Sequence, residues 1–164
     1  MSKTAITVSI RNKAEPKTWA ILACTLLLAS CSAGSANLRA GNGQNGRQLA
    51  PCGFGPHCVS SLAKGSVGHV DPIAYTGSRA VARQHLEQVI GGMKGAKIVQ
   101  QLPDYIHATY TSAMLGFVDD VEFVLPPDSH DIQLRSSSRV GFYDFGVNRA
   151  RVETIRKRFE APAG

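Results

Sequence analysis

The chain has 164 residues, the length of a single domain, and its 43% hydrophobic and 18% charged residues exclude an intrinsically disordered protein. The formal net charge is +6, but four of the 18 basic residues and one of the 12 acidic residues precede Cys31, so the part that follows carries only +3. That mild excess does not indicate a nucleic-acid-binding surface.

The first 30 residues have the pattern of a signal peptide. A positively charged start with Lys3 and Arg11 precedes the apolar run WAILACTLLLAS at residues 19–30. A membrane-spanning helix needs roughly 20 apolar residues, so this shorter run predicts a segment that is removed on export.

The end of this run, Leu28-Ala29-Ser30-Cys31, resembles a bacterial lipobox. The resemblance implies cleavage before Cys31 and a diacylglycerol on its thiol. Acyl chains such as palmitate, at about 0.8 kcal/mol per buried CH₂, would hold the protein to a membrane. Ser32, and no aspartate, follows the cysteine. By resemblance to the sorting rules of bacteria with two membranes, this implies the periplasmic side of the outer membrane. The alternative is an ordinary secretory signal with an incidental cysteine.

The segment after Cys31 is rich in Gly, Asn, Ser and Ala as far as residue 50. The lipobox resemblance implies a lipidated cysteine at the start of residues 31–50, and this composition predicts that the rest of them form a flexible tether with a root-mean-square length of roughly 24 Å. The folded domain is predicted over residues 51–160, with a short tail at 161–164.

Two cysteines, Cys52 and Cys58, remain for the folded domain. In an oxidising compartment this pair predicts a local disulfide, worth about 2 kcal/mol for so short a loop. The rival is a metal site that adds His57 or His69. A structural zinc site usually takes four ligands in paired spacings, and a second cysteine pair is missing, so a disulfide is predicted and no metal or other cofactor.

Two helices and four strands are predicted in the domain. Ser78 suits the N-cap of the first helix, whose apolar stripe comprises Val81, Ala82, Leu86, Val89, Ile90 and Met93. The second helix is predicted from Val147 to Phe159, with Val152, Ile155 and Phe159 on its buried edge. The strands are predicted at residues 97–102, 105–112, 119–125 and 130–136.

The last two strands have a pattern that sets a register. With a turn on residues 126–129, Phe123 lies opposite Ile132 on an apolar side, and Asp120 lies opposite Arg135 on a charged side. The predicted fold class is therefore α+β, a single domain with a four-stranded antiparallel meander and both helices on one face.

The stretch RSSSRVGFYDFGVNRAR at residues 135–151 has two interpretations. Arginines could hold an anion with paired hydrogen bonds, or they could pair with aspartates and lock a structural corner between sheet and helix. The residues of this candidate corner are Arg135, Arg139, Asp144, Asn148, Arg149, Arg151, Asp119 and Asp120. The structural interpretation is favoured, because an aspartate is expected near each arginine.

No residue is assigned a catalytic role. Ser136, Ser137 and Ser138 lack a motif that would bring a base within reach. Asp119 and Asp120 are neighbours on a strand and are expected to point to opposite faces, which makes them a poor acid–base pair. His107 is expected at the surface or at a rim. The sequence contains no phosphate loop and no dinucleotide fingerprint.

Three motifs carry a resemblance to a known family. PHCVSS at 56–61, VDDVEF at 118–123 and the stretch at 135–151 resemble, in order and spacing, the domain-of-unknown-function family numbered 1499. His57 stands where that family usually has asparagine. The resemblance implies exported, often lipid-anchored envelope proteins with no established reaction.

These patterns predict a lipid-anchored envelope protein that acts as a non-catalytic binding or accessory module. Its partner would be an anionic or amphipathic envelope molecule, or an envelope protein. One alternative is a hydrolase that uses Asp119 or Asp120 with Arg139 and a histidine. The other is a purely structural lipoprotein, which predicts no pocket.

Overall fold

The computed structural model describes residues 41–43 and 46–161, all within the unit Ser32–Gly164. The predicted signal peptide and the lipidation site at Cys31 lie outside the described residues. Within these residues, neither helix has the length and apolar composition of a membrane-spanning segment. The helices are α1 (Arg79–Gly91) and α2 (Val147–Glu160). The strands are β1 (Gly41–Gly43), β2 (Gly46–Gln48), β3 (Cys58–Ser60), β4 (Ile73–Ala74), β5 (Ala96–Leu102), β6 (Tyr105–Thr111), β7 (Val118–Val124) and β8 (Asp131–Ser138).

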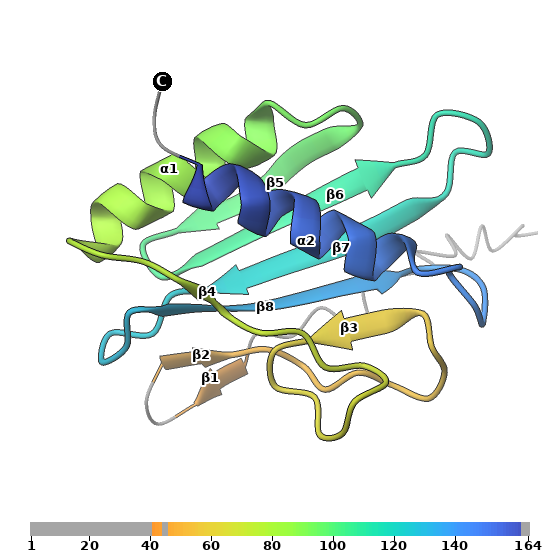
Figure 1. The fold of residues 1–164 in the computed structure, drawn as a ribbon, viewed down its shortest axis with the longest axis horizontal. Helices are drawn as coiled ribbons and strands as arrows, with labels where there is room; N and C mark the ends of the chain where they lie inside the picture. The colour runs from red at the N-terminus through yellow and green to blue at the C-terminus, as the bar shows by residue number, and fades with distance from the viewer. Residues whose placement is uncertain (1–40, 44–45, 162–164) are drawn as a thin grey trace, which may run out of the picture. The chain divides into compact units, whose positions relative to one another are not determined.

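The fold is α+β, and its main sheet is antiparallel with six strands, where four were predicted. The order is β3-β8-β7-β6-β5, and β4 also pairs with β8 (Figure 1). β3 covers the outer edge of β8 at residues 135–137 and β4 covers it at 131–132. The two missed strands are only two or three residues long, too short to show an alternating pattern, yet they protect an edge that would otherwise be open.

The register predicted for the last hairpin is wrong by two residues. Phe123 lies opposite Leu134, and Glu122 lies opposite Arg135. The turn is longer than predicted, because β7 ends at Val124 and β8 begins only at residue 131. A shift of two residues keeps each side chain on its predicted face, since side chains alternate along a strand with a period of two.

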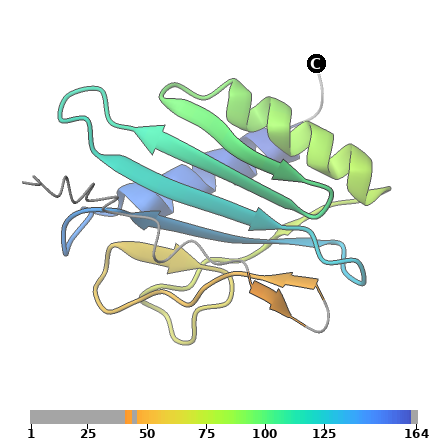
Figure 2. The ribbon, with the colours of Figure 1, turned by 180° about the vertical axis from the view of Figure 1, so that it is seen from behind.

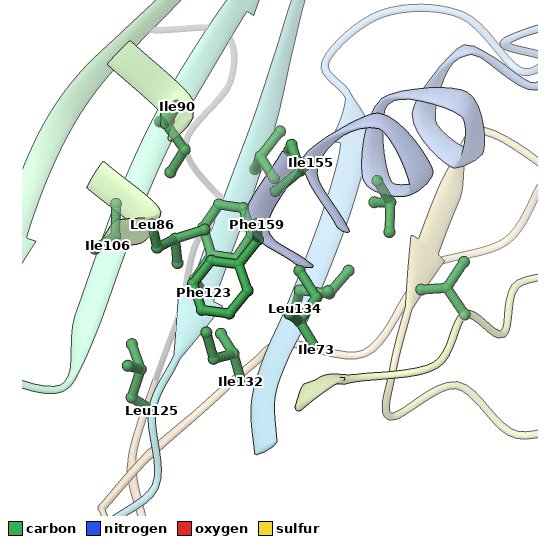
Figure 3. Close-up of a cluster of buried hydrophobic side chains, with 14 of the residues drawn as sticks. Ile73, Leu86, Ile90, Ile106, Phe123, Leu125, Ile132, Leu134, Ile155 and Phe159 are labelled. Atoms are coloured by element: carbon green, nitrogen blue, oxygen red, sulfur yellow. The ribbon is translucent and has the colours of Figure 1, made fainter. Parts of the chain in front are cut away.

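Both helices lie in front of the sheet in the view of Figure 1 and bury their apolar edges against it. Ser78 caps α1, since its hydroxyl accepts a hydrogen bond from the Val81 N–H at 3.3 Å. The side chain of Val81, which the predicted stripe included, is exposed. The shared core includes Ile73, Leu86, Ile90, Ile106, Phe123, Leu125, Ile132, Leu134, Ile155 and Phe159 (Figure 3).

The sequence predicts the start of the domain at Pro51, but the folded body begins earlier. β1 and β2 form a hairpin, and Leu49 is buried against Tyr105 and Val124. These two side chains alternate with Ile106 and Phe123 of the core, so they lie on the face of the sheet away from the helices. Figure 2 views the sheet from that side. Arg47 pairs with Asp104 at 3.3 Å. The last residues of the expected tether therefore belong to the domain.

Candidate functional site

The two adjacent carboxylates of β7 point to opposite faces of the sheet. Asp119 pairs with Arg151 of α2, on the helix side. Asp120 pairs with Arg139 and contacts His107, on the other side. The sheet therefore divides the predicted corner into two separate clusters, as the alternation of side chains along a strand requires.

Arg151 holds the helix-side cluster together. Its guanidinium pairs with Asp119, donates to the Asn148 side-chain oxygen at 2.7 Å, and lies 4.9 Å from the centre of the Tyr110 ring. Burial raises the pKa of Tyr110 to about 12, although the positive charge of Arg151 opposes the rise. The Tyr110 hydroxyl thus stays protonated and neutral at physiological pH.

Asn148, at the first turn of α2, is fully buried and makes the largest number of contacts in this cluster. Its side-chain nitrogen donates to the His57 carbonyl, the Ser138 hydroxyl and the Asp144 carboxylate, at 3.0, 2.9 and 2.7 Å. Its side-chain oxygen accepts a hydrogen bond from the Ser136 hydroxyl at 2.6 Å. One amide therefore ties the start of α2 to β8 and to the disulfide loop.

Asp144 secures the start of α2 from the preceding loop. Its carboxylate accepts hydrogen bonds from the backbone N–H groups of Gly146 at 2.9 Å and Asn148 at 3.0 Å. Burial opposes ionisation, but these hydrogen bonds outweigh it and lower the pKa of Asp144. Nearby, Arg149 donates to the Val67 carbonyl at 3.1 Å.

A second polar cluster lies on the face without helices. Arg139 donates two hydrogen bonds, of 2.7 and 2.8 Å, to the Asp120 carboxylate, and the His107 ring nitrogen Nε2 lies 2.8 Å from the same carboxylate. Burial raises the pKa of Asp120, but the bonds from Arg139 and His107 prevail and lower it below its ordinary range. His107 is buried, contrary to the prediction of a surface or rim position.

Arg135 pairs with Glu122, and the predicted partner Asp120 is bound elsewhere. The NH1 group of Arg135 lies 3.2 Å from the Glu122 carboxylate, which also accepts a hydrogen bond of 2.8 Å from the Tyr105 hydroxyl. Burial, and then the charge of Glu122, raise the pKa of Tyr105. The pairing follows from the observed register, in which Glu122 and Arg135 lie directly opposite each other.

Sequence reasoning missed Tyr105, His107 and Glu122 as members of this site. The available signal was that Tyr105 and His107 alternate along β6, as Asp120 and Glu122 do along β7. That alternation marks a second ordered face of the sheet. A tyrosine and a histidine beside two carboxylates could have been recognised as one polar face.

The disulfide between Cys52 and Cys58 is present, as predicted. Its sulfurs are therefore not available as metal ligands. Across the described ranges, no group of three or more His, Cys, Asp or Glu side chains could hold a metal ion. His69 instead contacts the Ala63 carbonyl through Nδ1 at 3.2 Å.

Two clefts adjoin the corner. The smaller, about 480 Å³, lies between α2 and the β6–β7 loop, with Asp119, Arg151 and Lys94 in its wall. The larger, about 680 Å³, lies beside the disulfide loop. Its wall includes Phe54, Leu62, Val67, Phe142 and Lys64. Clefts of this size and apolar lining are typical of small-molecule sites.

The motifs at the corner agree with a family-wide comparison. The family model described as "Protein of unknown function (DUF1499)" matches residues 48–159, which span β3 to α2 and both polar clusters. The chain belongs to this family. The match begins one residue before the buried Leu49, which supports the structural start of this DUF1499 domain. No curated protein and no solved structure matches the chain.

Proposed function

We propose that this DUF1499 domain is a lipid-anchored, non-catalytic binding or accessory module of the bacterial envelope. Its signal-peptide and lipobox patterns support an acyl anchor at Cys31 and an outer-membrane location facing the periplasm. The ligand is an anionic amphipathic envelope molecule held in the cleft beside the disulfide loop. The observation that carries this proposal is the apolar wall of that cleft with Lys64 among its lining residues.

The arrangement of the charged groups supports a structural role for the corner. Asp119, Asp120 and Glu122 each pair with an arginine. Asp119 stabilises the junction of the sheet with α2, and Asp120 and Glu122 stabilise the face without helices. Carboxylates held in this way offer no free acid or base to a substrate. A purely structural lipoprotein would need no cleft, whereas the larger cleft has room for an acyl chain.

Native mass spectrometry of the mature protein, purified from membranes, tests the proposal. We expect a diacylglyceryl group on Cys31 and a retained amphiphile in the wild type, and loss of the amphiphile in Lys64→Glu. Lys157→Glu, an exposed change of the same charge on α2, serves as the matched control and should retain it. A wild type with an unmodified Cys31, or with no bound molecule, would contradict the proposal.

One observation favours a hydrolase as the second candidate. His107, Asp120 and Arg139 form a hydrogen-bonded chain in which the carboxylate orients the imidazole, as a general base requires. Hydrolysis of activated ester substrates that is present in the wild type and abolished in His107→Gln would establish this candidate. Equal background rates in both proteins would leave the binding module as the function.

A further inference from the structure

Exposed apolar side chains gather at one end of the sheet, which we call the loop end. It comprises the loops at residues 52–57, 112–117 and 139–147, and Figure 1 shows these connections together at the right. The loops meet there because β6 and β8 end, and β3 and β7 begin, at the same end of the sheet. The exposed members are Phe54, Met114, Leu115, Phe117, Val140, Phe142, Tyr143, Phe145 and Val147.

Three of these side chains are almost fully exposed to solvent. Phe54, Met114 and Phe145 are 91%, 89% and 87% exposed, respectively. Phe145 also has a left-handed backbone with φ of 54°, which a bulky residue rarely adopts. Exposed apolar patches on this scale mark surfaces that meet a protein or a membrane.

The charge around the loop end favours a lipid surface. Asp144 is the single acidic residue in its three loops, and its carboxylate is turned inward to secure α2. The exposed Lys64 and Lys94 border the two clefts beside these loops. Aromatic tips with flanking lysines and no free carboxylate match the interface of a bilayer with anionic headgroups.

The chain is long enough to bring the loop end to the bilayer that would hold Cys31. Arg47 pairs with Asp104 in the turn between β5 and β6, so the domain begins at the opposite end of the sheet. A seven-residue strand such as β7 spans about 24 Å. The ten residues from Cys31 to Gly41 can reach at most about 35 Å, which exceeds this length.

We propose that the loop end inserts its aromatic side chains into the interface of an anionic lipid bilayer and thereby orients the domain on the membrane. This inference takes the acyl anchor from the proposed function and adds a second, independent membrane contact. Acyl anchoring becomes firm when a second signal accompanies it. Insertion would also place the cleft beside the disulfide loop at the membrane surface, within reach of an amphipathic ligand.

Tryptophan reporters in the mature protein, purified from membranes and reconstituted in phosphatidylethanolamine–phosphatidylglycerol vesicles, test this inference. Trp19, the one tryptophan of the chain, lies in the predicted signal peptide, so the mature lipidated protein has no tryptophan of its own to interfere. Phe145→Trp and Phe54→Trp then report on two loops of the loop end. Asp128→Trp, exposed in the β7–β8 turn at the opposite end, is the matched control. Sedimentation with the vesicles reports membrane attachment separately.

We expect a blue shift and quenching by brominated lipids for both loop-end reporters and neither effect for the control. Co-sedimentation with both loop-end reporters still in water would overturn the insertion and leave the anchor standing. Quenching of the control alone would show that the opposite end faces the lipid, which also overturns it. Failure to sediment, with all reporters in water, would overturn the anchor and the insertion together.

Discussion

The side-chain amide of Asn148 donates a hydrogen bond of 3.0 Å to the backbone carbonyl of His57, 91 positions earlier in the chain. The same carbonyl accepts a bond of 3.1 Å from the backbone N–H of Ser138, at the end of β8. Sheet, helix and disulfide loop thus meet at one oxygen atom. The stretch at 135–151 and the PHC segment belong to one structural junction.

Replacing Asn148 by alanine should lower the free energy of unfolding by about 3 kcal/mol, because several buried partners lose a hydrogen bond and the loop from His57 is released. Urea unfolding followed by circular dichroism measures this loss. Thr154→Ala, at an exposed position of the same helix, is the control and should cost less than about 1 kcal/mol. Equal losses in the two variants would show that the junction does not stabilise the fold.

The sequence was sufficient to predict the parts of the fold that have a long period. The stripe of α2 and the alternation of β6 to β8 extend over several turns or residue pairs, so they were recognised. β3 and β4 were missed because they owe their conformation to pairing with β8 and not to their own pattern. The predicted register of the last hairpin was wrong because the length of the turn cannot be inferred from Pro126-Pro127 alone.

The charged residues of the corner were named from the sequence, but only some of their pairing partners were. Asp144 at the start of α2 and the division of Asp119 from Asp120 followed from local rules. The pairing of Arg135 with Glu122 depends on the exact register, which is set by tertiary packing. His107 is buried because the second face of the sheet is covered, and the sequence of β6 alone does not show that this face is covered.

The substitution Asp120→Asn should make the free energy of unfolding less dependent on pH in the acidic range. Burial raises the pKa of Asp120, but the hydrogen bonds from Arg139 and His107 together outweigh it and depress the folded-state pKa. The ionised form of Asp120 therefore stabilises the fold above the ordinary aspartate pKa. We expect the variant to be about 2 kcal/mol less stable at pH 7, and this difference to shrink as the pH falls below about 4. Unfolding free energies at pH 7, 5 and 3 measure it. A difference that does not change with pH would contradict the ionic contribution.

Glu122 and Arg135 should behave as a coupled pair. Both side chains are almost fully buried, and Arg135 Nε has no hydrogen-bond partner within the described part of the chain. Glu122→Leu alone should cost about 4 kcal/mol, because it leaves a buried guanidinium without its carboxylate. The double variant Glu122→Leu/Arg135→Met should recover most of that loss. A double-mutant cycle of unfolding free energies checks the coupling, and additive losses would mean that the two residues act independently.

Gly95 should tolerate no side chain, because two constraints meet at its position before β5. Its φ is +79°, and a Cβ there would lie 2.6 Å from the Thr111 carbonyl oxygen, at the end of β6. Gly95→Ala should therefore lower the unfolding free energy by about 3 kcal/mol, from backbone strain and from displacement of the neighbouring strand. Gly65 has a similar φ of +89° with nothing within 4 Å of its Cβ site, so Gly65→Ala isolates the strain and should cost about 1 kcal/mol. Equal losses in thermal or urea unfolding would show that the approach of Thr111 adds nothing to the strain.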